Sequence, residues 1–229
     1  EDFPGLVSAI REITATYEDS LDFHFGGQPY IAGKVPGMIQ TETQKLMLTG
    51  LLIMSIILLV NLRSVPSVGM ILLVIVMSML SMMGFLGWIY HFTGSARFVF
   101  TFVNSSMPIV LLTIANSDGV HIMSRFFREA RKHKDVKQAI TQTLNQLLLP
   151  IFLTSITTSA AFLTMLTSPI TAMAGYGLSI GFGILWAWIL SSIFLPALIN
   201  VKTWNFSTAA LTKSSFLEKM VAIFGHNIL

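Results

Sequence analysis

Two side chains in one long apolar stretch could move a proton. Asp118 is the one formally charged residue within five apolar segments of the sequence, and His121 follows it three positions later. Residues three apart share a helix face, so an Asp–His pair at this spacing can share or relay a proton. Arg125 is the next charge, which puts Asp118 roughly 10 Å inside the end of its segment at about 1.5 Å per residue.

A carboxylate at that depth in a membrane costs about 2.5–3.5 kcal/mol on insertion scales. This cost favours a functional role for Asp118 over the alternative, a structural carboxylate near a solvated helix end. Asn116 and Ser117 precede it and make the middle of the segment unusually polar. We therefore expect Asp118 and His121 to form a proton relay, with Asn116 and Ser117 as supporting polar groups.

A run of hydroxyl side chains in the next apolar segment could provide partners for this carboxylate. The run consists of Thr154, Ser155, Thr157, Thr158 and Ser159. Its residues 154–158 lie roughly 10–16 Å from the start of their segment, which overlaps the depth of Asp118. We expect Thr154, Thr157 and Thr158 to hydrogen-bond the carboxylate or hold water beside it. Alternatively, they bond carbonyls of their own helix and allow close helix packing.

Two further observations concern packing and catalysis. Gly177 and Gly181 form a GxxxG pattern in the last apolar segment, which permits two helices to approach closely. The sequence contains no GxSxG, HExxH or P-loop motif, and without Cys it has no thiolate ligand or nucleophile. An aspartic intramembrane protease needs two carboxylates, whereas only Asp118 is available. We expect no enzymatic activity, no metal and no other cofactor.

The elements that position these residues are predicted from composition. Of 229 residues, 53% are hydrophobic and 11% are charged, against roughly 25% charged in an average soluble domain. This excludes an ordinary soluble enzyme, a nucleic-acid-binding domain and a disordered chain. We expect an all-α polytopic membrane protein. Five segments approach or exceed the length of about 20 residues that a bilayer requires: residues 46–62, 67–90, 98–124, 147–167 and 171–200.

The distribution of charge predicts the orientation of these spans. Basic residues gather in alternate connectors, at Arg63, in Arg125–Lys137, and at Lys202, Lys213 and Lys219. Short basic loops stay in the cytoplasm. Residues 1–45 contain seven acidic and three basic residues, a net charge of −4, which leaves +7 for the rest of a chain whose total is +3. We expect the inner (plasma) membrane, with the N-terminal segment outside, in the periplasm, and the C-terminus in the cytoplasm.

The flanking segments are predicted to be polar or amphipathic. Residues 1–34 are interpreted as a helix followed by a half-buried strand, because Leu21, Phe23 and Phe25 alternate; this would be the end of an extracytoplasmic α/β domain. Asp135–Leu147 and Ser215–Phe224 are amphipathic, and we expect both on the cytoplasmic membrane surface. The chain is interpreted as a piece of a longer protein.

Several motifs together resemble the resistance-nodulation-division (RND) superfamily. The stretch TIANSDGVHIMSRF at residues 113–126 is similar to the fourth transmembrane helix of that superfamily, in which an Asp is followed by a His and a Ser-Arg exit. Further similarities occur in the same order as in the family, at FGGQPY (25–30), NLRSVP (61–66), LTSITTSAAF (153–162), GYGL (175–178) and LPAL (195–198). The MmpL-like and hopanoid-type exporters and the Patched-like proteins with a sterol-sensing domain are the most similar group.

This resemblance implies a proton-driven pump built from two halves. Residues 1–34 would end its porter domain, residues 35–200 would be helices 2–6 of the first half, and residues 201–229 would be a cytoplasmic amphipathic linker to a second half. Asp118 matches the proton-carrying Asp of the family, whereas Gly119 stands where many lipid exporters have Tyr.

We therefore expect export of hydrophobic or lipid-like substrates, driven by the proton-motive force. The alternative is a non-pumping sterol- or lipid-sensing domain that regulates a partner protein. Expected partners are membrane lipids, the substrate, the second half of the same chain, a second copy of the chain and a periplasmic protein, but no nucleic acid.

Overall fold

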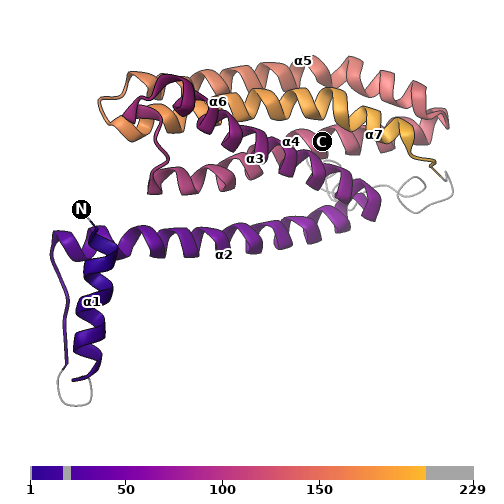
Figure 1. Cartoon of the computed structure of the whole chain (residues 1–229). Coiled ribbons are helices and arrows are strands. Elements are labelled where there is room, and N and C mark those ends of the chain that lie inside the picture. Colours follow the sequence, from indigo (N-terminus) through magenta and orange to yellow (C-terminus); the bar gives the residue numbers. More distant parts are fainter. Residues whose placement is uncertain (1, 18–21, 205–229) are drawn as a thin grey trace, which may run out of the picture. The chain divides into compact units, whose positions relative to one another are not determined.

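The computed structural model describes residues 2–17 and 22–204 (Figure 1). Its helices are α1 (Phe3–Ala15), α2 (Gln28–Leu62), α3 (Val65–Thr93), α4 (Met107–His133), α5 (Val136–Leu163), α6 (Thr171–Ile189) and α7 (Leu195–Val201). Three short 3-10 turns, Ala96–Phe98, Phe102–Ser106 and Thr164–Thr167, and one π-helical turn, Leu190–Phe194, connect or extend them. Five helical stretches in this part of the chain are long and apolar enough to cross a membrane, so the chain is a multi-pass membrane protein with an α-helical fold.

The helices extend beyond the apolar segments at several places. The third span begins with 3-10 turns, and its α-helix starts only at Met107, with Pro108 in the first turn. The same helix then continues through the basic stretch that was expected to be a connector and ends at His133. Basic side chains near a helix C-terminus are favoured by the helix dipole, which explains why the charges do not end the helix.

The predicted strand near the N-terminus is wrong. Residues 22–26 form no regular secondary structure, and no strand occurs among the residues that the structure describes. The alternation that suggested a strand is real, since Phe23 and Phe25 are half-buried while His24 between them is exposed. Their rings stack on each other with centroids 6.3 Å apart, and Phe25 stacks on Tyr30. The alternation of buried and exposed side chains at residues 23–25 therefore comes from local aromatic stacking. A β-strand would also need a partner strand to satisfy the hydrogen bonds of its backbone.

The expected amphipathic helix at Asp135–Leu147 is not a separate surface helix. It is the first part of α5, which continues without interruption into the fourth span. Asp135 caps this helix as expected, because its carboxylate accepts a hydrogen bond from the Lys137 backbone N–H at 3.0 Å. Ala139 and Thr143 are buried, so this face packs on the helical bundle. The other predicted amphipathic segment, Ser215–Phe224, lies outside the described residues, as do Lys213 and Lys219.

The chain divides into two compact units at Leu48 and Thr49, and α2 contributes residues to both. In the first unit, α1 lies against the beginning of α2. The contact is closest at Gly33, where an added Cβ would lie 2.5 Å from the carbonyl oxygen of Phe3. Glycine is therefore required at this crossing, because no side chain would fit between the two backbones.

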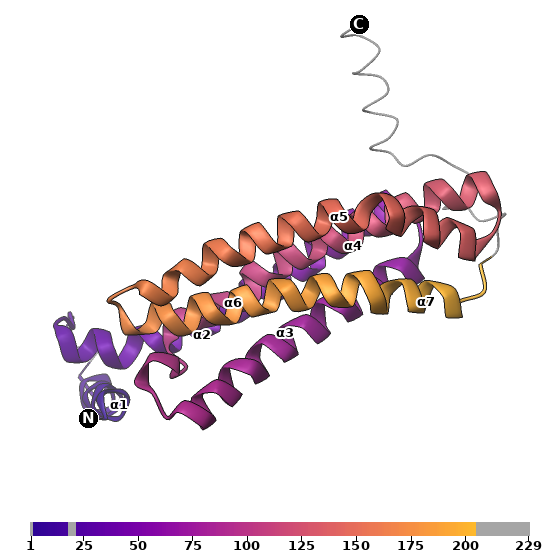
Figure 2. The ribbon, with the colours of Figure 1, turned by 90° about the horizontal axis from the view of Figure 1, so that it is seen from above.

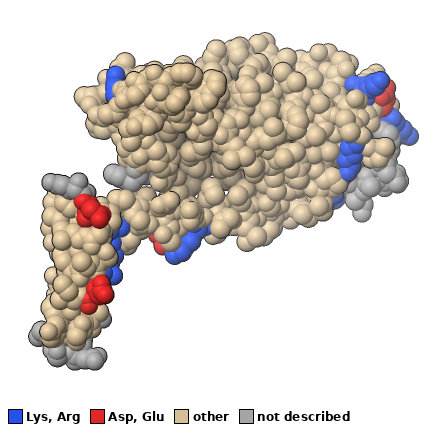
Figure 3. Space-filling view, viewed as in Figure 1, with Lys and Arg blue, Asp and Glu red and all other residues tan. Residues whose placement is uncertain are grey.

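The second unit is a helical bundle with a continuous apolar core. Figure 2 shows α5 lying along α6, and α6 also packs on α3 and α4. Its largest fully buried side chains come from four helices, namely Ile71, Val74, Ile75 and Met82 of α3, Met107, Leu111, Met123 and Phe126 of α4, Ile180 and Ile184 of α6, and Leu195 and Ile199 of α7. The outer faces are apolar as well, with Leu52, Leu80 and Leu149 exposed, as expected for contact with lipid. Figure 3 shows Lys and Arg side chains gathered at the end of this bundle where α4 ends, which we call the basic end.

Three turns of the bundle contain a residue in the left-handed conformation. Gly94 ends α3 with φ of 59°, and its N–H bonds the Tyr90 carbonyl at 2.8 Å. Arg63, between α2 and α3, and Lys134, between α4 and α5, have φ of 50° and 54°. Glycine is the usual residue for such caps, since other L-residues are strained there. The two non-glycine caps are both basic residues.

Candidate functional site

Asp118 lies in the middle of α4 and faces α5. It is 7% exposed, and one carboxylate oxygen, Oδ2, is buried without a hydrogen-bond partner among the described residues. Ser155 on α5 lines the same pocket, and its side chain lies next to the carboxyl group. The carboxyl group is therefore only partly satisfied by the protein, which is uncommon for a buried polar group.

A pocket of about 490 Å³ opens beside this carboxyl group, between α4 and α5. Its polar wall consists of Ser117, Asp118 and His121 from α4 and Thr154, Ser155 and Thr158 from α5; its apolar wall includes Ile114, Leu147, Pro150 and Ile151. The structure thus places both members of the predicted relay, and three of the five predicted supporting residues, around one cavity. A pocket of this size can hold several water molecules beside the carboxyl group.

Two predicted supporting residues do not line this pocket. Asn116 lies two residues before Asp118 and therefore points to a different side of α4. Its Oδ1 is buried and has no hydrogen-bond partner in the part of the chain that the structure describes. Thr157 is exposed, and its hydroxyl donates to the carbonyls of Leu153 and Thr154 at 2.8 and 3.0 Å.

The threonines that do line the pocket also bond their own helix. The Thr154 hydroxyl donates to the Ile151 carbonyl at 2.8 Å, and the Thr158 hydroxyl donates to the Thr154 carbonyl at 2.7 Å. This geometry is the packing alternative considered above, in which hydroxyls satisfy themselves within the helix. Each threonine oxygen still has lone pairs that can accept a hydrogen bond from water in the pocket.

Ser155, rather than a threonine, contacts the carboxyl group. The sequence run contains this serine, but depth alone did not distinguish it from its neighbours. Ile151, Ser155 and Ser159 are all buried and recur every four residues, so they mark the face of α5 that packs inward. That spacing is the signal that could have singled out Ser155.

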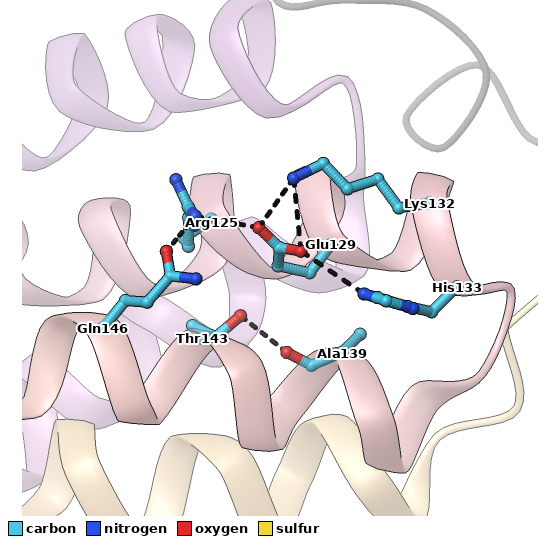
Figure 4. Close-up of polar contacts among 7 residues, drawn as sticks. All are labelled: Arg125, Glu129, Lys132, His133, Ala139, Thr143 and Gln146. Carbon is cyan, nitrogen blue, oxygen red and sulfur yellow. Dashed lines mark hydrogen bonds and ion pairs between the residues drawn. The ribbon is translucent and has the colours of Figure 1, made fainter.

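Glu129 was missed because it was assigned to a connector. It lies in the last turns of α4, and its side chain is 3% exposed (Figure 4). Its carboxylate forms ion pairs with Arg125 at 2.9 Å and Lys132 at 3.2 Å, and the Nε2 atom of His133 lies 3.7 Å from it. These partners stand three or four residues away on the same helix, which is the spacing expected of helical ion pairs. The pattern was visible in the sequence once the helix is continued to His133.

Small residues bring α5 and α6 close together next to the site. A Cβ added to Gly177 would lie 2.4 Å from the Phe162 carbonyl oxygen, and one added to Gly181 would lie 3.1 Å from Leu163 Cγ. Gly183 faces the other way, with an added Cβ 3.0 Å from Met82 Sδ on α3. The α6 backbone is therefore packed closely between α5 and α3. This packing limits the movement of α5, the helix that carries Ser155.

This arrangement can exchange a proton with the pocket. The carboxyl group has one hydroxyl contact and one unpaired oxygen, and His121 stands on the same pocket wall as a second titratable group. Residues 2–17 and 22–204 contain no group of three His, Asp or Glu side chains that could hold a metal ion. What the site offers is therefore a partly satisfied carboxyl group beside a cavity large enough for water.

Comparison with known proteins adds two findings. The model of the MMPL family matches residues 4–214. Human Protein dispatched homolog 1 is 29% identical over 113 residues, which are 48% of this chain and 7% of that protein. The mouse protein of the same name is 31% identical over 102 residues, 44% of this chain and 7% of that protein. The chain thus corresponds to a small part of these relatives.

Proposed function

The chain belongs to the MMPL family, and on that premise we propose that it is part of a transporter that exports hydrophobic or lipid-like molecules by using the proton-motive force. The observation that carries this proposal is the buried, partly unsatisfied carboxyl group of Asp118 beside a pocket. A membrane protein keeps an ionisable group at such a position at a considerable free-energy cost, and proton relays are a common reason.

Asp118 and His121 form the proposed proton relay. A proton entering the pocket from outside binds the Asp118 carboxylate, and its later release occurs towards the basic end of the bundle. Ser117, Thr154 and Thr158 hold water in the pocket, because all three line it. Asn116 and Thr157 lie off the pocket and would act on it only through the packing of their helices.

Neutralising Asp118 changes how α4 packs on α5, because the Ser155 hydroxyl then meets a carboxylic acid instead of a carboxylate. Close packing at Gly177 and Gly181 would pass a shift of α5 to α6. Since α2 runs from Gln28 to Leu62 and contributes residues to both units, it is the proposed route by which a movement of the bundle reaches the N-terminal unit. This is the proposed link between the proton and the substrate.

The proposed orientation follows from the charges. The basic end carries most of the Lys and Arg residues of the bundle and would lie in the cytoplasm, with the N-terminal unit outside. The proposed location is the inner (plasma) membrane. Membrane lipids, the exported molecule and a second half of the same protein are the proposed partners, and a second copy or a periplasmic protein would complete the assembly.

A second candidate function is a non-pumping lipid or sterol sensor that regulates a partner. The apolar wall of the pocket, with Ile114, Leu147 and Ile151, favours this candidate, because such a surface can accept a lipid chain. A sensor would bind lipid saturably whether or not a proton gradient is present.

The full-length protein in phosphatidylethanolamine–phosphatidylglycerol vesicles tests both functions. Transport of a fluorescent phosphatidylethanolamine is followed with and without an imposed pH gradient, in the wild type and in Asp118→Asn. We expect the gradient to drive transport only in the wild type. Asp135→Asn is the matched control, since Asn also caps helices. Normal gradient-driven transport by Asp118→Asn would refute the proton role, and gradient-independent saturable binding would favour the sensor.

A further inference from the structure

Among the described residues, Asp118 and Glu129 are the two buried acidic side chains, and both belong to α4. They stand eleven residues apart, which is close to three complete helical turns, so they lie on nearly the same face. Glu129 occupies an unfavourable place for an acid, because it is buried and sits in the last turns of a helix, where the dipole is negative. Local stability alone therefore does not explain why an acidic residue stands at this position.

Arg125 connects Glu129 to α5. One guanidinium nitrogen, Nη2, lies 2.9 Å from the Glu129 carboxylate and also donates a hydrogen bond to the side-chain oxygen of Gln146 on α5 (Figure 4). Glu129 therefore holds Arg125 in the orientation that reaches the neighbouring helix. Lys132 and His133 also contact Glu129, but both belong to α4 itself and form no hydrogen bond or ion pair with α5 in the described part of the chain.

This bridge lies on the basic-end side of the Asp118 site, between that site and the C-terminus of α4. Arg125 is seven residues, or about 10 Å, beyond Asp118 along α4. Gln146 is nine residues before Ser155 along α5, which runs in the opposite direction. Arg125 and Gln146 thus join the same pair of helices whose facing residues Asp118 and Ser155 line the pocket.

Pro150 separates these two contacts on α5. A proline inside a helix has no N–H, so the Gln146 carbonyl loses the hydrogen bond it would otherwise receive. The helix is therefore weakened between the segment that Arg125 holds and the segment that carries Ser155. Because Pro150 also lines the pocket, a change of angle at this point alters the position of Ser155 relative to Asp118.

We propose that Glu129 is a positioning residue for the Asp118 site: through Arg125 and Gln146 it holds the first segment of α5 against α4, so that the segment after Pro150 keeps Ser155 opposite Asp118. This inference rests on the proposed function for its significance, since the positioned group is the proposed proton carrier. The contacts themselves stand independently of that function.

Cysteine cross-linking in the full-length protein tests this alignment without any transport measurement. The present chain contains no Cys, so introduced pairs are the only thiols that it contributes. Ile114 and Thr158 line the pocket from facing helices, each about one turn beyond the Asp118–Ser155 contact. Thr154 lines the same pocket one turn nearer the basic end. In the otherwise unchanged protein, Ile114→Cys with Thr158→Cys should form a disulfide more readily than Ile114→Cys with Thr154→Cys.

Glu129→Gln keeps the size of the side chain and removes its charge. We expect this substitution to abolish the difference between the two disulfide yields, in protein that still elutes as a single folded species. Adding Gln146→Glu should restore the difference, because Arg125 then again pairs with a carboxylate, now on α5 itself. Lys132→Gln is the matched control, since it removes another partner of Glu129 that does not reach α5.

The proposal is overturned if Glu129→Gln leaves the wild-type preference unchanged, if Lys132→Gln removes the preference equally, or if Gln146→Glu gives no rescue. These results are distinct from failure of the proposed function. If Asp118→Asn transported normally while the cross-linking behaved as expected, Glu129 would still position Ser155, but the positioned site would not carry protons.

Discussion

The Ser159 hydroxyl on α5 donates a hydrogen bond to the Gly181 carbonyl oxygen on α6 over 2.8 Å, and both residues are buried. This hydrogen bond joins two helices whose backbones come close because Gly181 has no side chain. It lies one helical turn beyond Ser155 on the same face of α5. The helix that carries Ser155 is therefore fastened to α6 one turn further along by a short polar contact.

Removal of this contact should weaken the bundle. Ser159→Ala is expected to reduce stability by about 0.6 kcal/mol, the average found for hydrogen bonds between membrane helices. The Gly181 carbonyl keeps its place in the helix ladder, so no buried group is left wholly unsatisfied. Thermal unfolding in detergent micelles measures the change. Ser78→Ala is the control, because that serine is also buried but bonds only the Val74 carbonyl of its own helix; equal losses in both variants would contradict the prediction.

Replacement of Gly177 by alanine is expected to destabilise the protein, whereas replacement of Gly84 by alanine is expected to stabilise it. A Cβ at position 177 would lie 2.4 Å from a backbone oxygen, so Gly177→Ala must push α6 from α5 at a cost of about 1–3 kcal/mol, typical of overpacking. No atom lies within 4 Å of a Cβ added at Gly84 in α3. Gly84→Ala should therefore gain about 0.5–1 kcal/mol from the lower entropy of the unfolded chain. Measured unfolding free energies should change in opposite directions in the two variants relative to the wild type, and a change in the same direction would contradict the prediction.

Transport should depend on Ser155 more than on Thr158, although both line the pocket. Ser155→Ala removes the hydroxyl contact of Asp118, and we expect gradient-driven transport to fall by roughly fivefold, which corresponds to about 1 kcal/mol for one hydrogen bond. Thr158→Ala removes a hydroxyl that bonds its own helix, so its effect should be smaller. Initial rates in vesicles measure both, and a larger loss in Thr158→Ala would show that the contact at Ser155 is unimportant.

The proposed orientation can be tested with single thiols in intact cells. Thr93→Cys lies at the end of the bundle that carries few charges, and Lys134→Cys lies at the basic end. A membrane-impermeant maleimide should label Thr93→Cys in intact cells and Lys134→Cys only after permeabilisation. Labelling of Lys134→Cys in intact cells would contradict the proposed orientation and show the opposite one.

The spans were predictable because hydropathy depends on residue type alone. A bilayer requires about 20 apolar residues wherever they come from, so the five stretches are evident from the sequence. The isolation of Asp118 was visible for the same reason. The position of Ser155 beside it was not predicted, because five hydroxyl residues occupy similar depths and depth alone does not select among them; the four-residue spacing of the buried residues of α5 does.

Two errors have a common physical origin. The strand was inferred from alternation at Phe23 and Phe25, and Glu129 was assigned to a loop because basic residues surround it. In both cases local chemistry was taken as evidence of the backbone conformation. Stacked rings can produce a period of two without a sheet, and a helix can continue through charges that pair along one face.

The left-handed turns have a consequence for how the protein enters the membrane. Gly94 occupies such a turn at one end of the bundle, while Arg63 and Lys134 occupy the equivalent turns at the basic end, where an L-residue costs roughly 1–2 kcal/mol more than glycine. Arg63→Gly and Lys134→Gly should therefore make the mature fold more stable. The same changes remove positive charge from the basic end, so more molecules should insert in the wrong orientation. Those molecules would be detected because their Thr93→Cys thiol is protected from the impermeant maleimide. The two strained turns therefore keep positive charges that direct the orientation of the protein during membrane insertion, although glycine at the same positions would make the folded protein more stable.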